Sequence, residues 1–234
     1  MNLIERLSDG LKQLIFPHNC IVCGRVLVRG EHQLCTYCET SLPKTGFERF
    51  RGNPTEMRFW GKVDVYSGFS AYYYRKGQVI SHLIHDFKYH NNREIAVYLG
   101  RLMGVMIKKS KMSDDYDCIV PVPLHPHKLN IRGYNQCSLL AQGVSQVCGL
   151  PVNEEILLRE KFSVSQTKKS KFERITSLNG SFVISREAER FSGLRVLLLD
   201  DVLTTGATLE VCCRALSKIP RVRIGVVTLA FAND

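Results

Sequence analysis

The second half of the chain alternates between short apolar runs and segments with helical periodicity. The apolar runs are residues 117–122, 181–185, 194–201 and 222–231, and the helical patterns cover residues 133–149 and 205–219. Strands that are apolar throughout are buried on both faces, which is typical of parallel sheets covered by helices. The pattern therefore predicts an α/β domain in which a parallel sheet is flanked by helices.

The first half of the chain is less regular. Residues 66–74 predict a strand rich in aromatic side chains, and residues 78–89 and 92–109 predict two helices. Residues 3–15 predict an amphipathic helix that packs against the body of the protein. Glycine and proline near residues 52–61 mark a break. We therefore expect an N-terminal module at residues 1–60 and a second domain at residues 61–234, with its core at residues 115–234.

Four cysteines in the N-terminal module form two C-x-x-C pairs. Cys20 and Cys23 make the first pair, and Cys35 and Cys38 follow after eleven intervening residues. Four thiolates close the coordination shell of a tetrahedral zinc ion, and each C-x-x-C pair supplies one side of it. A redox or iron–sulfur role stays open, although the spacing favours neither. The sequence predicts a structural zinc module that stabilises a segment too small to have its own core.

The chain is basic, with a formal net charge of +10 over 234 residues. This charge favours anionic partners such as phosphorylated metabolites or nucleic acid, although a basic surface alone is not specific. No apolar run approaches the ~20 residues that span a bilayer, and the N-terminus lacks a secretory signal, so we expect no membrane insertion. Nine cysteines without an export signal indicate a reducing compartment, and we expect the cytoplasm.

Two adjacent carboxylates, Asp200 and Asp201, follow the apolar run at residues 196–199. In an open parallel sheet, ligands bind beyond the carboxyl ends of the strands. A hydroxyl-rich turn follows and leads into a predicted helix, whose first N–H groups suit a phosphate. The turn comprises Thr204, Thr205, Gly206, Ala207 and Thr208. Sugar hydroxyls or Mg²⁺ would partner the carboxylates, so the pattern predicts a pentose-phosphate site; the alternative is an ordinary strand–helix turn with a threonine cap.

A proline-rich stretch follows the apolar run at residues 117–122. Pro123 and its neighbours prevent the strand from continuing, so the chain loops out at the carboxyl edge of the sheet. Lys128 and Arg132 then place two cations near the same crevice, where they suit a pyrophosphate group. Asn135 is a candidate cap for the next helix. A simple connecting loop is the alternative.

These motifs resemble those of a known superfamily. Residues 196–208 (VLLLDDVLTTGAT) are similar to the signature of type I phosphoribosyltransferases, which bind phosphoribosyl pyrophosphate (PRPP) with Mg²⁺. The resemblance implies that Asp200 and Asp201 contact the ribose hydroxyls and that residues 204–208 hold the 5′-phosphate. It also implies the fold of that superfamily for the predicted sheet.

The proline-rich stretch narrows the resemblance to the ComF family, which includes ComFC and GntX-type proteins. Its usual Arg-Gly-Phe-Asn-Gln motif corresponds to residues 132–136, with Tyr134 in place of the phenylalanine. Gln166 and Arg174 match a basic segment that resembles the loop closing over pyrophosphate; the asparagine usual there falls on Ser177. Lys88 and Tyr89 also lie in a ComF-like segment and are candidates to line the cleft. ComF proteins commonly carry an N-terminal zinc module, in agreement with the cysteine spacing.

Two functions remain open at this point. The first is a transferase that moves phosphoribosyl groups, with Asp200, Asp201, Lys128 and Arg132 as its catalytic residues and an acceptor that the sequence does not identify. Residues 61–112 are a possible hood that would recognise this acceptor. The second, implied by the ComF resemblance, is a PRPP sensor or scaffold that supports DNA uptake in natural transformation. It would contact single-stranded DNA non-specifically through phosphates, or act through a helicase-like partner.

Overall fold

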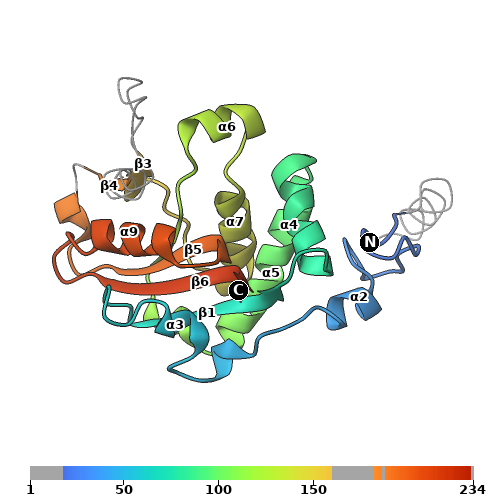
Figure 1. The fold of residues 1–234 in the computed structure, drawn as a ribbon, viewed down its shortest axis with the longest axis horizontal. Coiled ribbons are helices and arrows are strands. Elements are labelled where there is room, and N and C mark those ends of the chain that lie inside the picture. The colour runs from blue at the N-terminus through green and yellow to red at the C-terminus, as the bar shows by residue number, and fades with distance from the viewer. Residues whose placement is uncertain (1–17, 160–181, 186–187, 233–234) are drawn as a thin grey trace, which may run out of the picture. The chain divides into compact units, whose positions relative to one another are not determined.

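The computed structural model describes residues 18–159, 182–185 and 188–232 and divides the chain into two compact units, residues 1–43 and 44–234 (Figure 1). The helix expected at residues 3–15 lies outside the described residues. Residues 44–60, which the sequence analysis grouped with the cysteines, pack instead on the second unit. Asn53 Nδ2, for example, donates to the carbonyl of Gly68 at 2.8 Å, so the division falls at residue 43 rather than near residue 60.

The first unit is a small loop structure around the cysteines. Its one helix among the described residues is α2 (Thr36–Thr40), and Cys35 caps this helix by accepting from Cys38 N–H with its sulfur. A bridge between Asn19 and Val26 closes the turn that holds the first C-x-x-C pair. Few side chains other than the cysteines are buried here, so a bound ion would supply the cohesion that a core gives elsewhere.

The second unit is built on a four-stranded sheet. Its strands are β1 (Ser67–Tyr74), β6 (Arg223–Ala232), β5 (Arg195–Leu203) and β2 (Cys118–Pro121), in that order. Every pair is parallel, which confirms the predicted sheet. β1 belongs to a segment expected as a possible hood, but it is an edge strand of the sheet. Its first six residues are buried beside β6, so β1 belongs to the core of the sheet, and the hood stays a prediction.

Helices cover the sheet. The longer ones are α4 (Val79–Tyr89), α5 (Arg93–Lys109), α7 (Gln136–Cys148) and α9 (Ala207–Leu216), and the shorter elements are η1 (Phe47–Arg49), α3 (Pro54–Met57), η2 (Met112–Asp115), α6 (Pro126–Arg132) and η4 (Ala188–Phe191). Figure 1 shows α4, α5 and α7 grouped together, while α9 runs alongside β5 and β6. The four longer helices confirm the helical patterns predicted from periodicity.

One predicted strand lies outside the parallel sheet. Residues 182–184 form β4 (Phe182–Ile184), which pairs antiparallel with β3 (Leu157–Arg159) in a separate two-stranded ribbon. β4 has three residues and only Phe182 is buried, so it lacks the continuous burial of a central strand. Periodicity alone did not reveal this difference.

Helices α5 and α7 pack closely through glycine. A side chain at Gly143 would collide with the backbone of α5, since a Cβ there would lie 2.8 Å from both Arg101 N and Gly100 Cα. Gly104 faces Val144 and Val147 in the same way. Residues later in α5 meet residues later in α7, so the two helices run parallel and their amino ends lie at the same end of the sheet. That end carries the candidate site.

Candidate functional site

The acidic pair lies within β5, at a step in the edge of the sheet. β5 continues through Leu203, four residues beyond the run at 196–199, and stays paired with β6 up to Phe231. On its other side the ladder with β2 ends at the pair Pro121–Leu199. Asp200 and Asp201 therefore come directly after the last β2 pairing, where an open parallel sheet binds its ligands.

Asp200 is half-buried and held by short-range donors. Its Oδ1 accepts from the Asp201 backbone N–H at 2.8 Å and from the Cys137 thiol at 3.3 Å. Burial, together with repulsion from Asp201, raises the pKa of Asp200 to about 7. Its charge is therefore poorly compensated in this state, and added hydroxyl donors or a cation would stabilise the ionised form.

Asp201 is buried and paired with a cation. Its Oδ2 lies 2.7 Å from Lys88 Nζ and accepts from Gln136 Nε2 at 3.0 Å. Burial opposes the charge of Lys88, but the attraction of Asp201 outweighs it and raises the pKa of the lysine. Lys88 was predicted only as a residue lining the cleft. The structure places it directly on the acidic pair.

A cavity of about 530 Å³, here called the basic pocket, adjoins the acidic pair. It is lined by Lys88, Tyr89, Asn91, Arg93, Lys128, Asn130, Ile131, Arg132, Gly133 and Tyr134. Four of these side chains are cationic and none is acidic. Arg132 Nη1 donates to Gln136 Oε1 at 2.5 Å, and Gln136 in turn donates to Asp201, so hydrogen bonds connect this pocket to the acidic pair.

The turn at residues 204–208 leads into α9 as predicted. Gly206 has φ 84°, a left-handed conformation that glycine adopts without strain, and it forms the cap of the helix. Thr204 and Thr205 are exposed. Among the described residues, the contacts at the 205–208 amides consist of Ala207 N–H donating to Thr205 Oγ1 at 3.4 Å. The amides at the start of α9 are thus available to an anion.

Three contributors to this region were missed by sequence reasoning. Gln136 and Cys137 open α7, and Asn135 before them caps it by accepting from Cys137 N–H. Burial lowers the pKa of Arg159 in β3, although the charge of Asp200 opposes this shift. Among the residues that the structure describes, no group pairs with its buried Nε. The glutamine lay inside the motif already noted, but nothing in the sequence marked Arg159.

The remaining predicted residues divide into two groups. Pro123 lies in the loop between β2 and α6, where the strand was expected to end, and Lys128 is exposed on α6. Gln166 and Arg174 lie outside the described residues. β3 and β4 flank the segment that contains them. The structure therefore brings together the acidic pair, Lys88 and Arg132.

The four cysteines of the first unit form one cluster. Their sulfur atoms all lie within 4.8 Å of one another, and Cys23 Sγ and Cys35 Sγ are 3.8 Å apart. Four sulfurs at about 2.3 Å from a tetrahedral zinc ion are about 3.8 Å from each other, so the cluster fits zinc. Although burial opposes it, hydrogen bonds from the backbone at Cys35, Cys23 and Val22 lower the pKa of Cys20 to about 6. The thiolate that a metal needs is thereby favoured.

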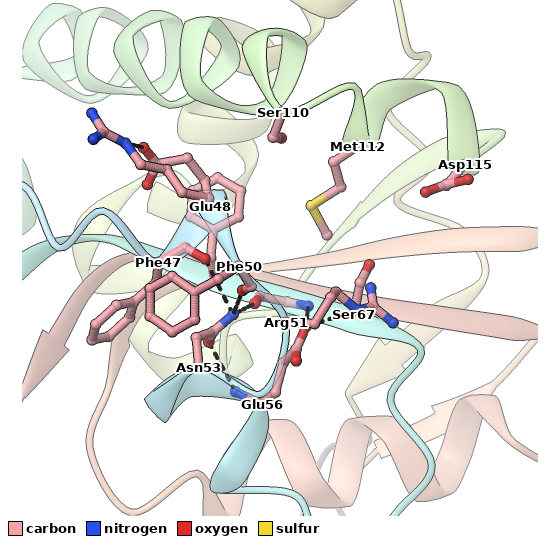
Figure 2. A pocket seen from close by; sticks show the side chains of 13 residues that line it. Phe47, Glu48, Phe50, Arg51, Asn53, Glu56, Ser67, Ser110, Met112 and Asp115 are labelled. Atoms are coloured by element: carbon pink, nitrogen blue, oxygen red, sulfur yellow. Dashed lines mark hydrogen bonds and ion pairs between the residues drawn. The ribbon is translucent and has the colours of Figure 1, made fainter.

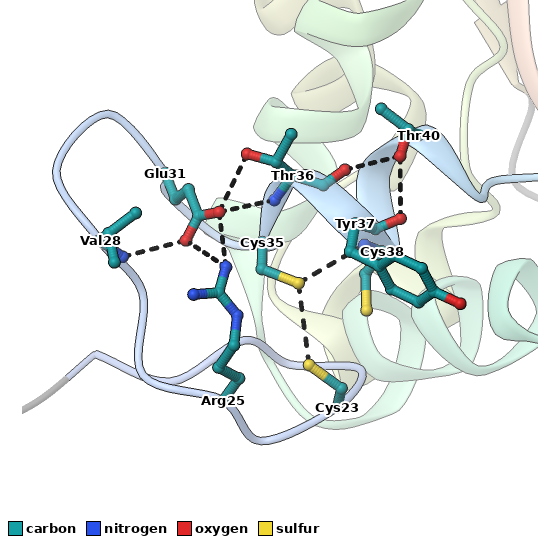
Figure 3. A network of polar contacts seen from close by, with 9 residues as sticks. All are labelled: Cys23, Arg25, Val28, Glu31, Cys35, Thr36, Tyr37, Cys38 and Thr40. Atoms are coloured by element: carbon teal, nitrogen blue, oxygen red, sulfur yellow. Dashed lines mark hydrogen bonds and ion pairs between the residues drawn. The ribbon is translucent and has the colours of Figure 1, made fainter.

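Glu31 stabilises the loops around the cysteine cluster through hydrogen bonds and an ion pair. Figure 3 shows its carboxylate accepting from Thr36 N–H at 2.7 Å and Val28 N–H at 3.0 Å, with Arg25 at 2.6 Å. These backbone hydrogen bonds lower the pKa of Glu31 to about 2. The carboxylate fixes the start of α2, and with it the position of Cys35.

Comparisons with known proteins agree with this geometry. Residues 137–234 match the family model described as a phosphoribosyl transferase domain. Competence protein F of Haemophilus influenzae is 29% identical over 232 residues, covering 93% of this chain and 98% of the relative. Competence protein ComFC of Bacillus subtilis is 27% identical, covering 86% and 72%. DNA utilization protein YhgH of Escherichia coli K12 is 28% identical, covering 81% and 79%.

Solved structures show weaker similarity. The allosteric regulatory enzyme of purine biosynthesis has 15% identity and a TM-score of 0.41, and the match covers 61% of this chain and 29% of that one. Adenine phosphoribosyltransferase of Leishmania tarentolae has 14% identity and a TM-score of 0.38, covering 83% and 100%. The chain thus spans less than a third of the first of these structures.

The parallel sheet, with its acidic pair before a threonine–glycine turn, is a type I phosphoribosyltransferase-like domain. Joined to an N-terminal cysteine cluster, it is the arrangement expected from the ComF motifs. Over most of its length the chain is similar to proteins named competence protein F and competence protein ComFC, in agreement with the predicted ComF resemblance.

Within the described ranges, no helix is both long and apolar enough to cross a bilayer.

Proposed function

We propose that this protein binds PRPP, or a related phosphoribosyl ligand, at the carboxyl edge of its sheet and transfers the phosphoribosyl group to an acceptor. The observation that carries the proposal is the position of the acidic pair. Two residues after the pair the chain enters the turn at residues 204–208, and Gln136 connects the pair to the basic pocket. The ligand offers two hydroxyls, a phosphate and a pyrophosphate, which match these three parts.

Each part has a chemical role in the proposed transfer. The ribose hydroxyls donate to Asp200 and Asp201, and the 5′-phosphate accepts from the amides at the start of α9. Lys128 and Arg132, aided by Lys88, stabilise the negative charge that develops on the leaving pyrophosphate. Arg132 suits this role because its planar guanidinium binds phosphate oxygens in pairs. Gln166 and Arg174 are proposed to join this side of the site.

The reaction needs little more from the protein. As the bond to pyrophosphate breaks, the ribose gains oxocarbenium character, and a nucleophile held at the correct distance completes the transfer. No side-chain nucleophile is required. Asp200 and Asp201 offer the carboxylate oxygens that Mg²⁺ prefers, and a bound Mg²⁺ would neutralise pyrophosphate charge.

The first unit is proposed to hold structural zinc through Cys20, Cys23, Cys35 and Cys38. The fit of the sulfur cluster supports this assignment. The nine cysteines of the whole chain suit a reducing compartment, so we propose that the protein is cytoplasmic.

Calorimetry with PRPP and Mg²⁺ tests the proposed site. We expect Asp200→Asn combined with Asp201→Asn to weaken binding by about 100-fold, since two charge-assisted contacts are lost. Thr204→Glu is a second variant, because an exposed carboxylate at the turn repels phosphate without disturbing the core. Asp114→Asn, an exposed aspartate before β2, is the matched control. Native affinity in both site variants would exclude this site.

A second function is favoured by the names of the relatives. Two of the relatives are named as competence proteins, and the basic pocket offers four cations to a phosphate backbone. We propose that the protein supports DNA uptake in natural transformation, by contacting single-stranded DNA directly or through a helicase-like partner. PRPP would then act as a sensed ligand or as a substrate.

Turnover and salt dependence separate the two functions. Release of pyrophosphate from PRPP with candidate acceptors identifies a transferase, whereas binding without turnover identifies a sensor. Direct DNA contact through phosphates predicts that affinity falls linearly on a logarithmic salt scale, and Lys128→Gln should reduce the slope by about 0.7. Affinity that does not change with salt contradicts phosphate contact.

A further inference from the structure

A second cavity lies at the amino-terminal edge of the sheet, at the other end of the strands from the acidic pair (Figure 2). Its volume is about 270 Å³. Ser67, the first residue of β1, lies in its wall and is in register with Gly225 of β6 and so with Leu197, three residues before Asp200. η1, the loop into α3, the end of α5 and η2 complete the wall. None of these residues takes part in the proposed PRPP site.

Buried hydrogen bonds hold the wall in place. The Asn53 side chain is 1% exposed; its Nδ2 donates to the carbonyls of Phe47, Phe50 and Gly68, and its Oδ1 accepts from the first amides of α3. Glu56 accepts from Gly68 N–H at 3.0 Å and from Gly52 N–H at 2.6 Å. Both side chains are satisfied by the backbone. The cavity is therefore built into the fold and does not depend on mobile surface groups.

Glu48 differs from these two residues because one of its oxygens has no partner. Its side chain is 15% exposed and its Oε2 is fully buried, with no hydrogen bond in the part of the chain that the structure describes. Its Oε1 has a single loose contact, at 3.5 Å, with Arg49 Nε, and Arg49 is 82% exposed. A buried carboxylate oxygen without a donor is costly unless a ligand or a water supplies one.

The other charged groups in the wall favour a positively charged ligand. Two arginines also line the cavity, but Arg49 is 82% exposed, and Arg51 donates to the carbonyl of Tyr66, stacks on its ring and lies 3.8 Å from Glu56 Oε1. Asp115 of η2 adds a third carboxylate to the wall, after Glu48 and Glu56, and Figure 2 shows it on the far side from Glu48. The interior is therefore acidic. A positively charged donor satisfies it better than a neutral one, since ionic hydrogen bonds are about twice as strong.

Apolar side chains shape the rest of the space. Phe47, Phe50, Phe69 and Met112 line the cavity, and the Phe50 side chain is about half exposed at its rim. Aromatic faces attract cations, and a thioether packs well against an aromatic ring. The volume is near the lower end of the ~300–1,000 Å³ range of small-molecule sites, so a ligand smaller than a nucleotide fits.

We propose that this cavity is a binding site for a small organic ammonium ion, whose charged group is held by Glu48 and whose apolar or aromatic body packs among the phenylalanine side chains. The site is separate from the PRPP site and does not depend on it.

Nuclear magnetic resonance with benzylammonium as the probe tests the proposal. We expect saturable binding to the full-length protein at about millimolar Kd, read from the Met112 methyl signal. Benzyl alcohol has the same shape without the charge and should bind at least about tenfold more weakly. Glu48→Gln should reduce affinity for benzylammonium about tenfold, because it removes the charge and keeps the shape.

Two controls keep the test decisive. Glu155→Gln changes an exposed carboxylate outside the cavity and should leave benzylammonium binding unchanged. Ser110→Phe fills the cavity from the end of α5 and should abolish binding, whatever the stability of the Glu48 variant. If the native protein binds PRPP, all three variants should bind it with native affinity, which verifies that they are folded. If it does not bind PRPP, thermal unfolding verifies their folding instead. Equal binding of the alcohol and the ammonium ion, or native affinity in Glu48→Gln, would overturn the proposal.

Discussion

At the scale of single residues, the acidic pair consists of two carboxylates in different states. Asp201 has Lys88 and Gln136 as partners, whereas the hydrogen bonds of Asp200 within the described ranges come from a thiol and one backbone amide. Burial, together with repulsion from Asp201, raises the pKa of Asp200 to about 7. The pair therefore carries less than its full charge near neutral pH until a ligand arrives.

Replacing Asp200 by asparagine should stabilise the protein at alkaline pH. A carboxyl whose pKa is raised on folding, here from 3.8 to about 7, favours the folded state at low pH, and this contribution is lost as pH rises through 7. We expect Asp200→Asn to raise Tm by about 4 °C at pH 8, a shift that corresponds to roughly 1–2 kcal/mol in a chain of this size. The difference should shrink toward pH 4. A larger gain at pH 4 than at pH 8 would contradict the assigned direction.

Replacing Lys88 should destabilise the protein. Lys88→Met keeps most of the side-chain volume but leaves Asp201 buried without its cation, which costs on the order of 3 kcal/mol. Urea unfolding at neutral pH measures this loss. Lys128→Met, an exposed lysine in the same pocket, should change stability by less than about 0.5 kcal/mol. Adding Asp201→Asn to Lys88→Met should restore most of the loss; no recovery would mean that the charge pair is not its cause.

At the scale of elements, periodicity identified the helices and most of the strands because their apolar faces repeat regularly. It assigned β4 to the wrong sheet, since three residues carry no information about pairing direction. In the candidate site, the acidic pair, the turn at 204–208 and Arg132 were predictable from local sequence. Lys88, Gln136 and Arg159 were harder to assign, because their contacts join segments far apart in the chain.

Because α5 and α7 are in close contact, we expect one added methyl group at Gly143 to lower the stability of the protein strongly. Gly143→Ala places a Cβ against the α5 backbone, and backbone yields less readily than a side chain. We expect a loss of about 3 kcal/mol in the free energy of unfolding, at the upper end for overpacked sites. Gln142→Ala, one residue earlier and exposed, is the control and should stay within about 0.5 kcal/mol. A loss below 1 kcal/mol for Gly143→Ala would mean that the helices separate easily.

At the scale of the whole molecule, the chain has two units with different sources of stability. The second unit has a continuous apolar core, whereas the first unit has few buried side chains apart from its cysteines. Cysteine spacing predicted the cluster because both pairs are local motifs. The limit of the N-terminal module was not predictable, since residues 44–60 are placed by hydrogen bonds to β1 that leave no periodic pattern.

Zinc should therefore affect one unit and not the other. We expect about one zinc per native chain by elemental analysis, lost in Cys35→Ser, with faster proteolysis confined to residues 18–43. Thermal unfolding of the second unit should be unchanged. Cys148→Ser, which alters a thiol in α7, should retain the metal. Less than half an equivalent of zinc in the native protein, with all four thiols freely titratable, would contradict the assignment.

The parallel glycine contact between α5 and α7 has a mechanical consequence. Arg93, at the first turn of α5, borders the basic pocket, while Gln136 and Cys137 begin α7 and hold the acidic pair. Because the two backbones approach so closely at these glycines, we expect the helices to move together. A ligand that displaces the pocket should then also displace the carboxylates, and a larger side chain at the contact should weaken this coupling before the protein begins to unfold.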